Sequence, residues 1–515
     1  MNSVHVAASP ARMRFAHLVH AQRAWWVAGA AVVILAITVQ PLRDSDVWWH
    51  LALGRFTAAH GLPSHEPFSF LSATHPWVDQ QWLYELLLYR MVSIGGAGFA
   101  SLAMGAVAAL AVVIAALALP RSQRIMGAWL AAGIVLSGLV MAQVAGVRGQ
   151  VFSVLGTAIV LLIVTRWREG STRAVWALPP LFLLWANIHA GFISGFAVLI
   201  VALLAASPLA PARTVDRQRL LAATLISALA TVVNPAGPAL IGYVGETFFN
   251  PTLTSAITEW ASPDFHNVWL RIFEAEVVLL VVLWVLSRGP DVLDVALAGA
   301  AVVATLQAQR NVSLFAILAV PQVARYGTVA WSLHVAPRVR ARRDPHSAGA
   351  PLMGALVTAA IVVCVAVTLA PQLSQATTAS FEASRYPEAA SNYVASHLAG
   401  QRLYSTDTWG GYLAYRFPGS RMVFLYGETA VFGDADLQVY EDVHLLRPNW
   451  SRVLATESIT HAVVPLRSQE ASGFHALDWT VDCYDSASGA VVMSALTDAA
   501  PQPDLLSAPS AARRC

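Results

Sequence analysis

The chain has 515 residues, of which 57% are hydrophobic and only 12% are charged, and its mean hydropathy is +0.57. Soluble domains carry about twice that share of charge, so the composition excludes an ordinary cytosolic enzyme. All 32 basic residues are arginine and they exceed the 30 acidic residues by only two, an excess too small to indicate a nucleic-acid partner.

Apolar runs close to the length that crosses a bilayer as a helix recur through the first three quarters of the chain. They predict an α-helical polytopic membrane protein whose transmembrane module covers residues 24–375. The expected spans are 24–41, 97–119, 125–146, 150–166, 174–187, 190–207, 219–233, 271–287, 292–309, 311–327 and 351–371, which makes eleven crossings.

The arginines predict how these spans are oriented, because basic residues near span ends stay on the cytoplasmic side. With residues 1–23 taken as a cytoplasmic N-terminal arm, the inner segments hold 17 arginines. The outer loops hold only five, which are Arg43, Arg55, Arg90, Arg148 and Arg310. We therefore expect a multi-pass protein of the plasma membrane, and an odd number of spans puts its C-terminal part outside.

From about residue 376 the composition becomes more polar, which indicates a separate extracytoplasmic domain over 376–500. Strands are expected at 402–405, 421–426, 461–465 and 490–493, and helices at 387–397, 409–415 and 450–456. Strands that alternate with helices favour a small α/β layer fold. Residues 501–515, rich in Pro, Ser and Ala, are expected to be a disordered tail. Cys483 and Cys515 can form a disulfide if both residues face an oxidising compartment, and the sequence does not decide this.

Several polar residues lie at one predicted depth, the outer ends of the spans. Ionisable groups in spans are costly and usually mark a site, although helix capping or snorkelling explains each of them singly. A channel would instead place polar groups across the whole thickness, and the inner ends carry only loop charges. The common depth therefore favours an outward-facing site. The residues are Arg148, Gln150, Asn187, His189, Asn234, Gln307, Gln309 and Arg310.

The predicted first outer loop, 42–95, begins with Asp44 and Asp46. Two carboxylates at this spacing can share a metal ion, or one can act as a general base while the other adjusts its pKa. Trp48 and Trp49 follow, for which the alternative is the interfacial tryptophan belt. Glu259, in a later outer loop, offers a third carboxylate. The histidines of the first loop match no zinc-ligand spacing.

These stretches resemble the GT-C superfamily of polytopic glycosyltransferases, which use polyprenyl-phosphate-linked sugars. The likeness is strongest to a bacterial subgroup with an aspartate-rich, double-tryptophan first loop. The matching stretches are Asp44–Leu51, Trp77–Glu85, Arg148–Ser153, Leu184–Gly191, Asn234-Pro235, Glu259-Trp260 and Trp409–Leu413.

The resemblance implies transfer of a sugar to an extracytoplasmic glycan, lipid or protein, with Asp44 or Asp46 as the catalytic base. Residues 257–259 also resemble a short acidic motif of oligosaccharyltransferases, which adds Glu259 to the catalytic candidates. Arg148 and Arg310 are expected to hold the donor phosphate. A divalent cation, Mg²⁺ or Mn²⁺, between Asp44 and Asp46 is the cofactor to consider. Substrate contacts are expected from Trp48, Trp49, His50, Trp77, Asp79, Trp82, Gln150, Asn187 and His189.

Three alternatives compete with sugar transfer. A lipid-carrier transporter or flippase is expected to show internal repeats and polar groups near the bilayer midplane, and the sequence shows neither. A scaffold that anchors the soluble domain needs fewer spans than eleven. The sequence does not exclude a transferase that moves a different group from the same lipid carriers. It also does not identify the sugar, the acceptor or the stereochemistry of transfer.

Overall fold

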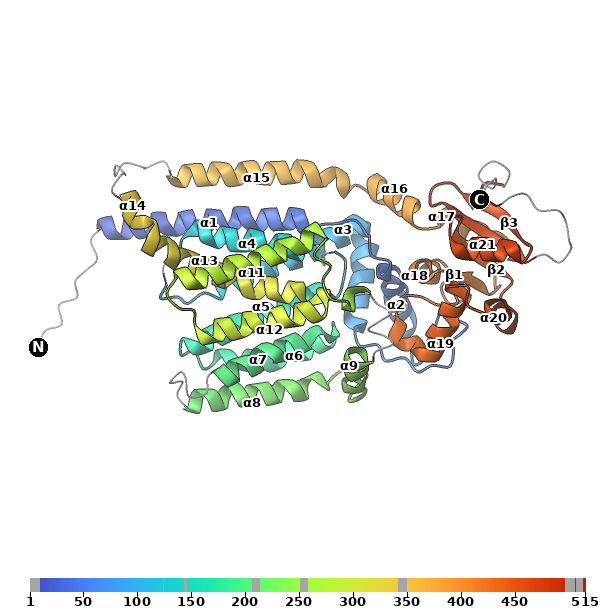
Figure 1. The fold of residues 1–515 in the computed structure, drawn as a ribbon, viewed down its shortest axis with the longest axis horizontal. Coiled ribbons are helices and arrows are strands. Elements are labelled where there is room, and N and C mark those ends of the chain that lie inside the picture. The colour runs from blue at the N-terminus through green and yellow to red at the C-terminus, as the bar shows by residue number, and fades with distance from the viewer. Residues whose placement is uncertain are drawn as a thin grey trace, which may run out of the picture.

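The computed structural model describes residues 10–123, 125–142, 146–205, 214–250, 258–340, 350–495, 505 and 513–515. A long bundle of helices carries a smaller α/β domain at one end, and the N-terminus lies at the other end (Figure 1). The bundle helices are α1 (Pro10–Thr38), α3 (Trp82–Leu117), α4 (Gly127–Met141), α5 (Gln150–Arg168), α6 (Leu178–Ala186), α7 (Ile193–Ala205), α8 (Thr214–Thr231), α11 (Val268–Leu286), α12 (Val292–Gln307), α13 (Val312–His334) and α15 (Ala350–Gln372).

Each predicted apolar run coincides with one of these helices, but the number of membrane crossings stays a prediction. Within the described ranges, three helices are long and apolar enough to cross a bilayer on their own, namely Trp82–Leu117, Gln150–Arg168 and Gln309–His334. A fourth candidate is a pair of helices, Thr358–Gln372 and Gln375–Arg385, bent by 53°. Five further apolar helices are shorter: Ala24–Thr38, Gly127–Met141, Ala174–Ala186, Ala190–Ala205 and Val292–Gln307.

The helix ends follow local capping chemistry, and two helices begin earlier than the predicted spans. The side chains of Asn267 and Asp291 accept hydrogen bonds from backbone N–H groups in the first turns of α11 and α12. α1 begins at Pro10, inside the predicted arm, and α3 begins at Trp82, inside the predicted first loop. α3 is kinked at Gly96, whose φ of 73° favours glycine. The part of α3 before this kink therefore falls within residues 42–95, which are predicted to form the first outer loop.

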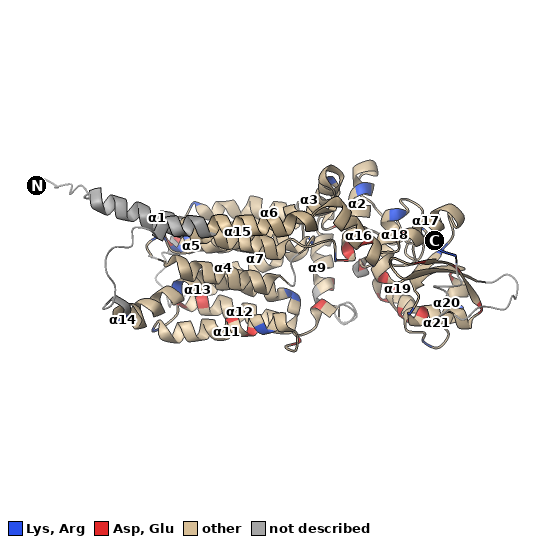
Figure 2. Cartoon of the chain, turned by 90° about the horizontal axis from the view of Figure 1, so that it is seen from above, with Lys and Arg blue, Asp and Glu red and all other residues tan. Residues whose placement is uncertain are grey.

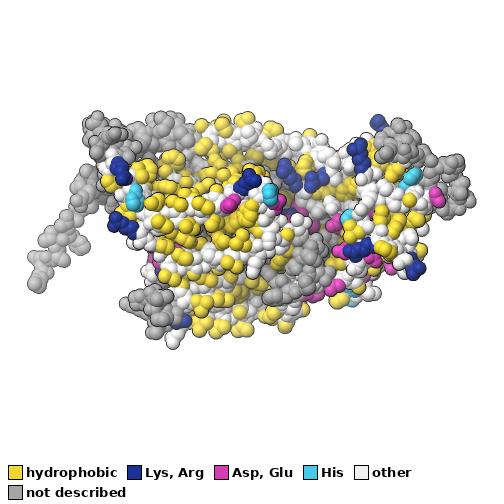
Figure 3. Space-filling model, in the orientation of Figure 1, with side chains coloured by type: hydrophobic (Ala, Val, Ile, Leu, Met, Phe, Trp, Pro, Cys, Tyr) yellow, Lys and Arg dark blue, Asp and Glu magenta, His cyan; other side chains and the backbone are white. Residues whose placement is uncertain are grey.

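The core of the bundle lies around α13, which packs against α4, α11 and α12. Phe315 on α13 is fully buried, and its ring meets Phe273 on α11 edge-on at 5.0 Å. Large apolar side chains are exposed around the bundle, for example Leu229 on α8 and Val285 on α11. On the face shown in Figure 3, hydrophobic side chains cover much of the bundle, and in Figure 2 charged residues lie mainly toward its ends and on the C-terminal domain. Such a surface suits lipid contact.

The C-terminal domain contains a four-stranded mixed sheet of order β1-β2-β4-β3, so an α/β layer fold is present as predicted. β1 pairs with β2 in parallel, and the other neighbouring strands are antiparallel. The strands are β1 (Leu403–Ser405), β2 (His461–Pro465), β3 (Trp479–Asp485) and β4 (Ala490–Ala495). The helices after α15 are α16 (Gln375–Arg385), α17 (Glu388–His397), α18 (Asp407–Arg416), α19 (Thr429–His444), α20 (Trp450–Thr456) and α21 (Gln469–Ala476).

One predicted strand was wrong and one strand was missed. Residues 421–426 form no strand: Val423 makes only isolated bridges, to Ser69 and Leu403. The segment is apolar because it is buried between β1 and the first outer loop, and burial alone gave it a strand-like composition. β3 was missed because its alternation is interrupted by polar residues and by a register shift between Val481 and Cys483.

The expected disordered tail is anchored at its end. Cys483 on β3 forms a disulfide with Cys515, with 5.0 Å between their Cα atoms. The backbone N–H of Tyr484 donates to the carbonyl of Arg513 at 2.9 Å, so residues 513–515 lie against β3. Apart from Leu505, residues 501–512 lie outside the described ranges, and for them disorder remains a prediction.

Candidate active site

The first outer loop places Asp44 between the bundle and the C-terminal domain. After α1 ends, the side-chain amide of Gln40 donates to the carbonyl of Ala142 at 2.9 Å, which fixes the loop to the end of α4. The carbonyl of Asp44 accepts a hydrogen bond from the hydroxyl of Tyr386 at 3.3 Å. Asp44 is therefore held from two sides.

Arg148 joins two of the predicted catalytic carboxylates. Its Nε pairs with Asp44 Oδ2, and its Nη1 pairs with Glu259 Oε1. Glu259 lies on η3 (Thr258–Trp260), and Arg148 lies just before α5. From the sequence, Asp44 and Arg148 were expected at the outer ends of the spans and Glu259 in a later outer loop; in the structure Arg148 contacts both carboxylates.

Arg310 lies beside this group on η4 (Gln309–Asn311). Its guanidinium carbon stands 4.7 Å from the ring centroid of Trp260, and its carbonyl accepts from the side chain of Gln150 at 2.9 Å. The side-chain amide of Gln309 donates to the carbonyl of Thr258 at 2.9 Å, which ties η4 to η3. Among the residues that the structure describes, Arg310 forms no ion pair with a carboxylate, so its charge is available to an anionic ligand.

His189 is held in one tautomer by its neighbours. Its Nδ1 accepts from the backbone N–H of Gly191 at 2.9 Å and lies 2.8 Å from the hydroxyl of Ser153. Trp185 in turn donates its indole N–H to that hydroxyl at 2.9 Å. Because Nδ1 accepts a hydrogen bond, the neutral ring carries its proton on Nε2. This N–H makes no hydrogen bond to the described residues and can donate one to a ligand.

A cavity of about 590 Å³ opens next to Asp44 and Arg148. One part of its lining is charged and consists of Arg43, Asp44 and Arg148. Trp269, at the start of α11, adds an aromatic ring to the lining. The other lining residues are Ile37, Gln40, Pro41, Ala142, Gly146 and Val147. The cavity is large enough for a sugar-sized group, and Asp46 is not among its lining residues.

Asp46 lies at the first position of α2 (Asp46–His60), where its backbone N–H donates to Asp44 Oδ1 at 3.2 Å. Its carboxylate lies against Gly427 of the C-terminal domain, where no side chain would fit. Removal from water and the nearby charge of Asp44 raise the pKa of Asp46 to about 8. At neutral pH, Asp46 is therefore largely protonated.

This raised pKa predicts how stability depends on pH. Because folded Asp46 keeps a proton that the unfolded chain releases near its ordinary pKa of 3.8, the folded state loses stability as the pH rises from about 4 to about 8. Asp46→Asn should remove this loss, so its gain in Tm over wild type should grow between pH 5 and pH 8. Thermal unfolding of the detergent-purified proteins at these pH values measures it, and parallel curves would contradict the assignment.

Trp48 and Trp49 lie in the contact between α2 and the C-terminal domain and not in an interfacial belt. The Trp48 ring is 5% exposed and lies within 5.3 Å, centroid to centroid, of Tyr386, Tyr412 and Tyr415. Trp49 is also buried and faces Tyr426. This burial contradicts the interfacial-belt alternative, and a contact of either ring with substrate stays a prediction.

Trp48→Ala should consequently behave as a core mutation. Truncating a buried tryptophan typically costs about 3 to 5 kcal/mol, and here the loss would loosen the C-terminal domain from α2. We expect a large fall in Tm with little change in the KM for substrate in the folded fraction. A raised KM with an unchanged Tm would show instead that the ring contacts substrate.

His50, Trp77 and Asp79 lie below the surface. His50 Nδ1 is 3.1 Å from Glu85 Oε1, and both side chains are buried. Burial raises the pKa of Asp79 to about 6, and Trp77 is 9% exposed. Contact of these three residues with substrate, predicted from sequence, would require the loop to open.

The side chains of Asn187 and Trp82 form hydrogen bonds that connect helix ends. The indole N–H of Trp82 donates to Asn187 Oδ1 at 2.9 Å, and Asn187 Nδ2 donates to the carbonyl of Val233 at 2.9 Å. Asn234 donates to the carbonyl of Ala186 at 2.9 Å. These bonds connect the outer ends of α3, α6 and α8, as the capping alternative for Asn187 proposed.

The carboxylates do not fit a divalent cation as they are arranged. Asp44 gives one oxygen to Arg148 and the other to the backbone N–H of Asp46. Glu259 is also engaged by Arg148. In the part of the chain that the structure describes, no three His, Cys, Asp or Glu side chains are placed to hold a metal ion. A metal between Asp44 and Asp46 therefore finds no open set of ligands.

Two residues near the site were missed from the sequence. Tyr243 on α9 (Ala239–Phe249) donates its hydroxyl to Glu428 Oε1 at 3.2 Å. Burial raises the pKa of Glu428 to about 7. Glu428 belongs to the C-terminal domain; from the sequence this domain was expected to cover the cavity, but no pattern singled out Glu428 or Tyr243.

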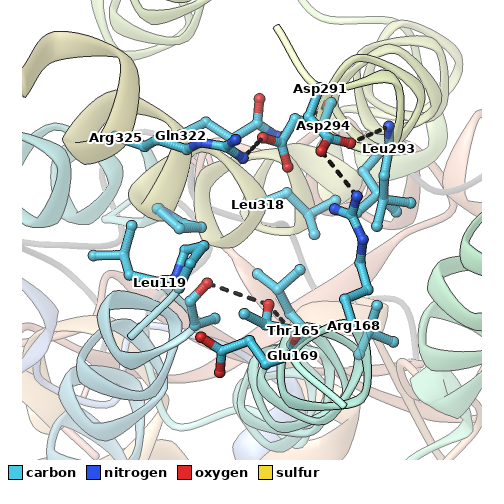
Figure 4. Close-up of a pocket in the computed structure, with 16 residues that line it drawn as sticks. Leu119, Thr165, Arg168, Glu169, Asp291, Leu293, Asp294, Leu318, Gln322 and Arg325 are labelled. Atoms are coloured by element: carbon cyan, nitrogen blue, oxygen red, sulfur yellow. Dashed lines mark hydrogen bonds and ion pairs between the residues drawn. The ribbon is translucent and has the colours of Figure 1, made fainter. Parts of the chain in front are cut away.

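The inner end of the bundle carries more polar groups than predicted. A cavity of about 220 Å³ there is lined by two ion pairs, Arg168 with Asp291 at 2.8 Å and Arg325 with Asp294 at 2.9 Å (Figure 4). Asp294 and Arg325 lie within α12 and α13 and not in loops. Because these charges neutralise each other, they hold α5, α12 and α13 together, whereas Arg310 at the other end of the bundle has no ion pair with a carboxylate among the residues that the structure describes.

The fold resembles two solved membrane glycosyltransferases. ArnT from Cupriavidus metallidurans, in the apo state, aligns over 96% of this chain and 100% of its own, with a TM-score of 0.51 and 16% identity. The oligosaccharyltransferase AglB from Archaeoglobus fulgidus, solved with an inhibitory peptide and a dolichol-phosphate, aligns over 92% of this chain and 75% of its own, with a TM-score of 0.55 and 12% identity.

The chain therefore shares the fold of these two solved structures, in line with the fold that the sequence resemblance implied. No family model matches the chain, and no curated protein matches its sequence. At 12% and 16% identity the likeness defines the fold. Donor, acceptor and chemistry must be argued from the site.

Proposed function

We propose that this protein is a GT-C glycosyltransferase that moves a sugar from a polyprenyl-phosphate donor to an extracytoplasmic acceptor. The observation that carries the proposal is the Asp44–Arg148–Glu259 group, assembled beside a cavity of about 590 Å³ in a GT-C fold. A donor anchored in the bilayer suits a site at the outer ends of apolar helices.

Asp44 is the base in this proposal, because it lines the cavity and Asp46 does not. A general base must reach the proton that it removes. The proton of the acceptor hydroxyl passes to Asp44, the acceptor oxygen bonds to the anomeric carbon, and the bond from that carbon to the phosphate oxygen breaks. The lipid phosphate leaves with the electron pair of that bond.

The two outer arginines take up the negative charge of the leaving phosphate. Arg310 has no carboxylate partner among the described residues, and Arg148 uses only its Nε and Nη1 on carboxylates, which leaves Nη2 for an anion. Charge-assisted bonds of this kind are among the strongest that a protein forms. His189 can donate its Nε2 hydrogen to a substrate oxygen, and Gln150 fixes the carbonyl of Arg310.

The proposal includes the predicted topology of eleven spans, a cytoplasmic N-terminus and an extracytoplasmic C-terminal domain in the plasma membrane. Two observations support it: the excess of arginines in the inner segments, and the Cys483–Cys515 disulfide, which is typical of oxidising compartments. The active site and the disulfide then lie on the same side of the membrane.

The test is transfer by the purified protein in liposomes from a panel of radiolabelled polyprenyl-phosphate sugars into extracytoplasmic glycans, lipids and peptides. We expect one donor to be turned over with label appearing in an acceptor. If every donor is bound or moved across the membrane without turnover, the carrier transporter or flippase alternative takes its place.

A further inference from the structure

Two carboxylates that come from separate outer loops share one guanidinium. Asp44 follows α1, and Glu259 lies on η3 before α11. Both side chains are paired with Arg148 and with no other cation in the described ranges. Carboxylates brought together in a partly buried site repel each other, so this arrangement requires a positive charge between them.

Arg148 is suited to this position by its shape. A guanidinium presents five N–H donors in a planar fork, so two different nitrogens can each address one carboxylate. Arg148 does this with Nε and Nη1. Burial acts against its charge, but Asp44 and Glu259 outweigh burial and hold the pKa of Arg148 above its ordinary value.

The site holds enough positive charge for its two paired carboxylates without a metal ion. Asp44 and Glu259 are opposed by Arg148 and Arg310, and Arg43 adds a third guanidinium in the wall of the same cavity. Arg310 stands over Trp260, the residue next to Glu259. Two guanidinium groups thus supply the charge that one divalent cation would bring, and the engaged oxygens of Asp44 leave such a cation without ligands.

We propose that the guanidinium of Arg148 occupies the place of a divalent cation at this site, where it holds the Glu259 segment against Asp44. Its consequence for catalysis rests on the proposed function. The consequences of the proposal for metal binding and for the order of residues 258–261 do not depend on the proposed function. They can therefore be tested even if no sugar is transferred.

The first test measures metal binding with no change at Arg148. Full-length protein in nanodiscs is treated with EDTA and titrated with Mn²⁺ up to about 1 mM, the weak end of known Ca²⁺ sites. The loss of the free-Mn²⁺ EPR signal is recorded. Wild type and Asp44→Asn should bind equally little. One Mn²⁺ bound per wild-type chain and lost in Asp44→Asn would overturn the proposal.

The second test measures how firmly residues 258–261 are held. Arg148→Ala should raise amide hydrogen exchange in this segment by about tenfold, and added methylguanidinium should restore protection. Exchange in α5 serves as the folding control, and Arg148→Lys is the second variant if the alanine protein unfolds. Arg43→Ala is the matched control, because Arg43 lines the same cavity and makes no ion pair among the described residues. Unchanged exchange in folded Arg148→Ala, or in folded Arg148→Lys if the alanine variant unfolds, would refute the proposal.

Discussion

Asp44→Asn is expected to lower sugar transfer by a factor of about 10² to 10⁴, the usual contribution of a general base. Asparagine keeps the shape of the side chain and an oxygen for Arg148, but it cannot accept the proton of the acceptor hydroxyl. The KM for the donor should change little, because Arg310 and Arg148 remain. Initial rates over a range of donor and acceptor concentrations separate kcat from KM.

Asp264→Asn is the matched control, because Asp264 is an exposed outer carboxylate that pairs only with the neighbouring His266 among described residues. It should retain the wild-type rate. If Asp44→Asn also retains that rate while Asp46→Asn loses it, the base is Asp46. If both variants keep the rate, the carboxylates serve structure only.

Arg310→Gln is expected to reduce kcat by a factor of about 10² to 10³, the effect of removing one group that stabilises developing negative charge. The guanidinium of Arg310 lies beside Trp260, the neighbour of Glu259, and forms no ion pair with a carboxylate in the described part of the chain. Loss of this guanidinium should therefore weaken the stabilisation of the leaving phosphate. It should also weaken the binding of the product, polyprenyl phosphate. Competition by unlabelled polyprenyl phosphate measures the second effect.

Arg90→Gln provides the comparison for this prediction. Arg90 is an exposed arginine on α3 that forms no ion pair among the described residues, and its loss changes the net charge equally. A similar loss of rate in both variants would mean that general attraction of anionic lipid is at work. A loss confined to Arg310→Gln supports a specific phosphate contact.

The positions of the bundle helices could be predicted from the sequence, because burial in lipid or in the bundle requires uninterrupted apolar runs. The grouping of Asp44, Arg148 and Glu259 could be predicted only as a common depth. Which nitrogen of Arg148 pairs with which carboxylate oxygen depends on the conformation of the loops. The hydrophobic periodicity of the sequence does not predict that conformation.

The double tryptophan shows where the sequence analysis failed. A tryptophan next to a span end has the same composition signal in an interfacial belt and in a contact with a soluble domain. Trp48 is buried by three tyrosines that lie more than 330 residues further along the chain, as the Tyr386–Asp44 hydrogen bond across 342 residues illustrates. Such long-range contacts, and the missed Glu428, follow from how the C-terminal domain docks.

The most direct test of sugar transfer uses a donor that carries ¹⁴C in the sugar and ³²P in the phosphate. Purified wild-type protein in liposomes should move ¹⁴C to the acceptor and leave ³²P on the polyprenyl lipid, and Asp44→Asn should move neither. Transfer of both labels together would contradict glycosyl transfer and identify a phosphotransferase acting on the same lipid carrier.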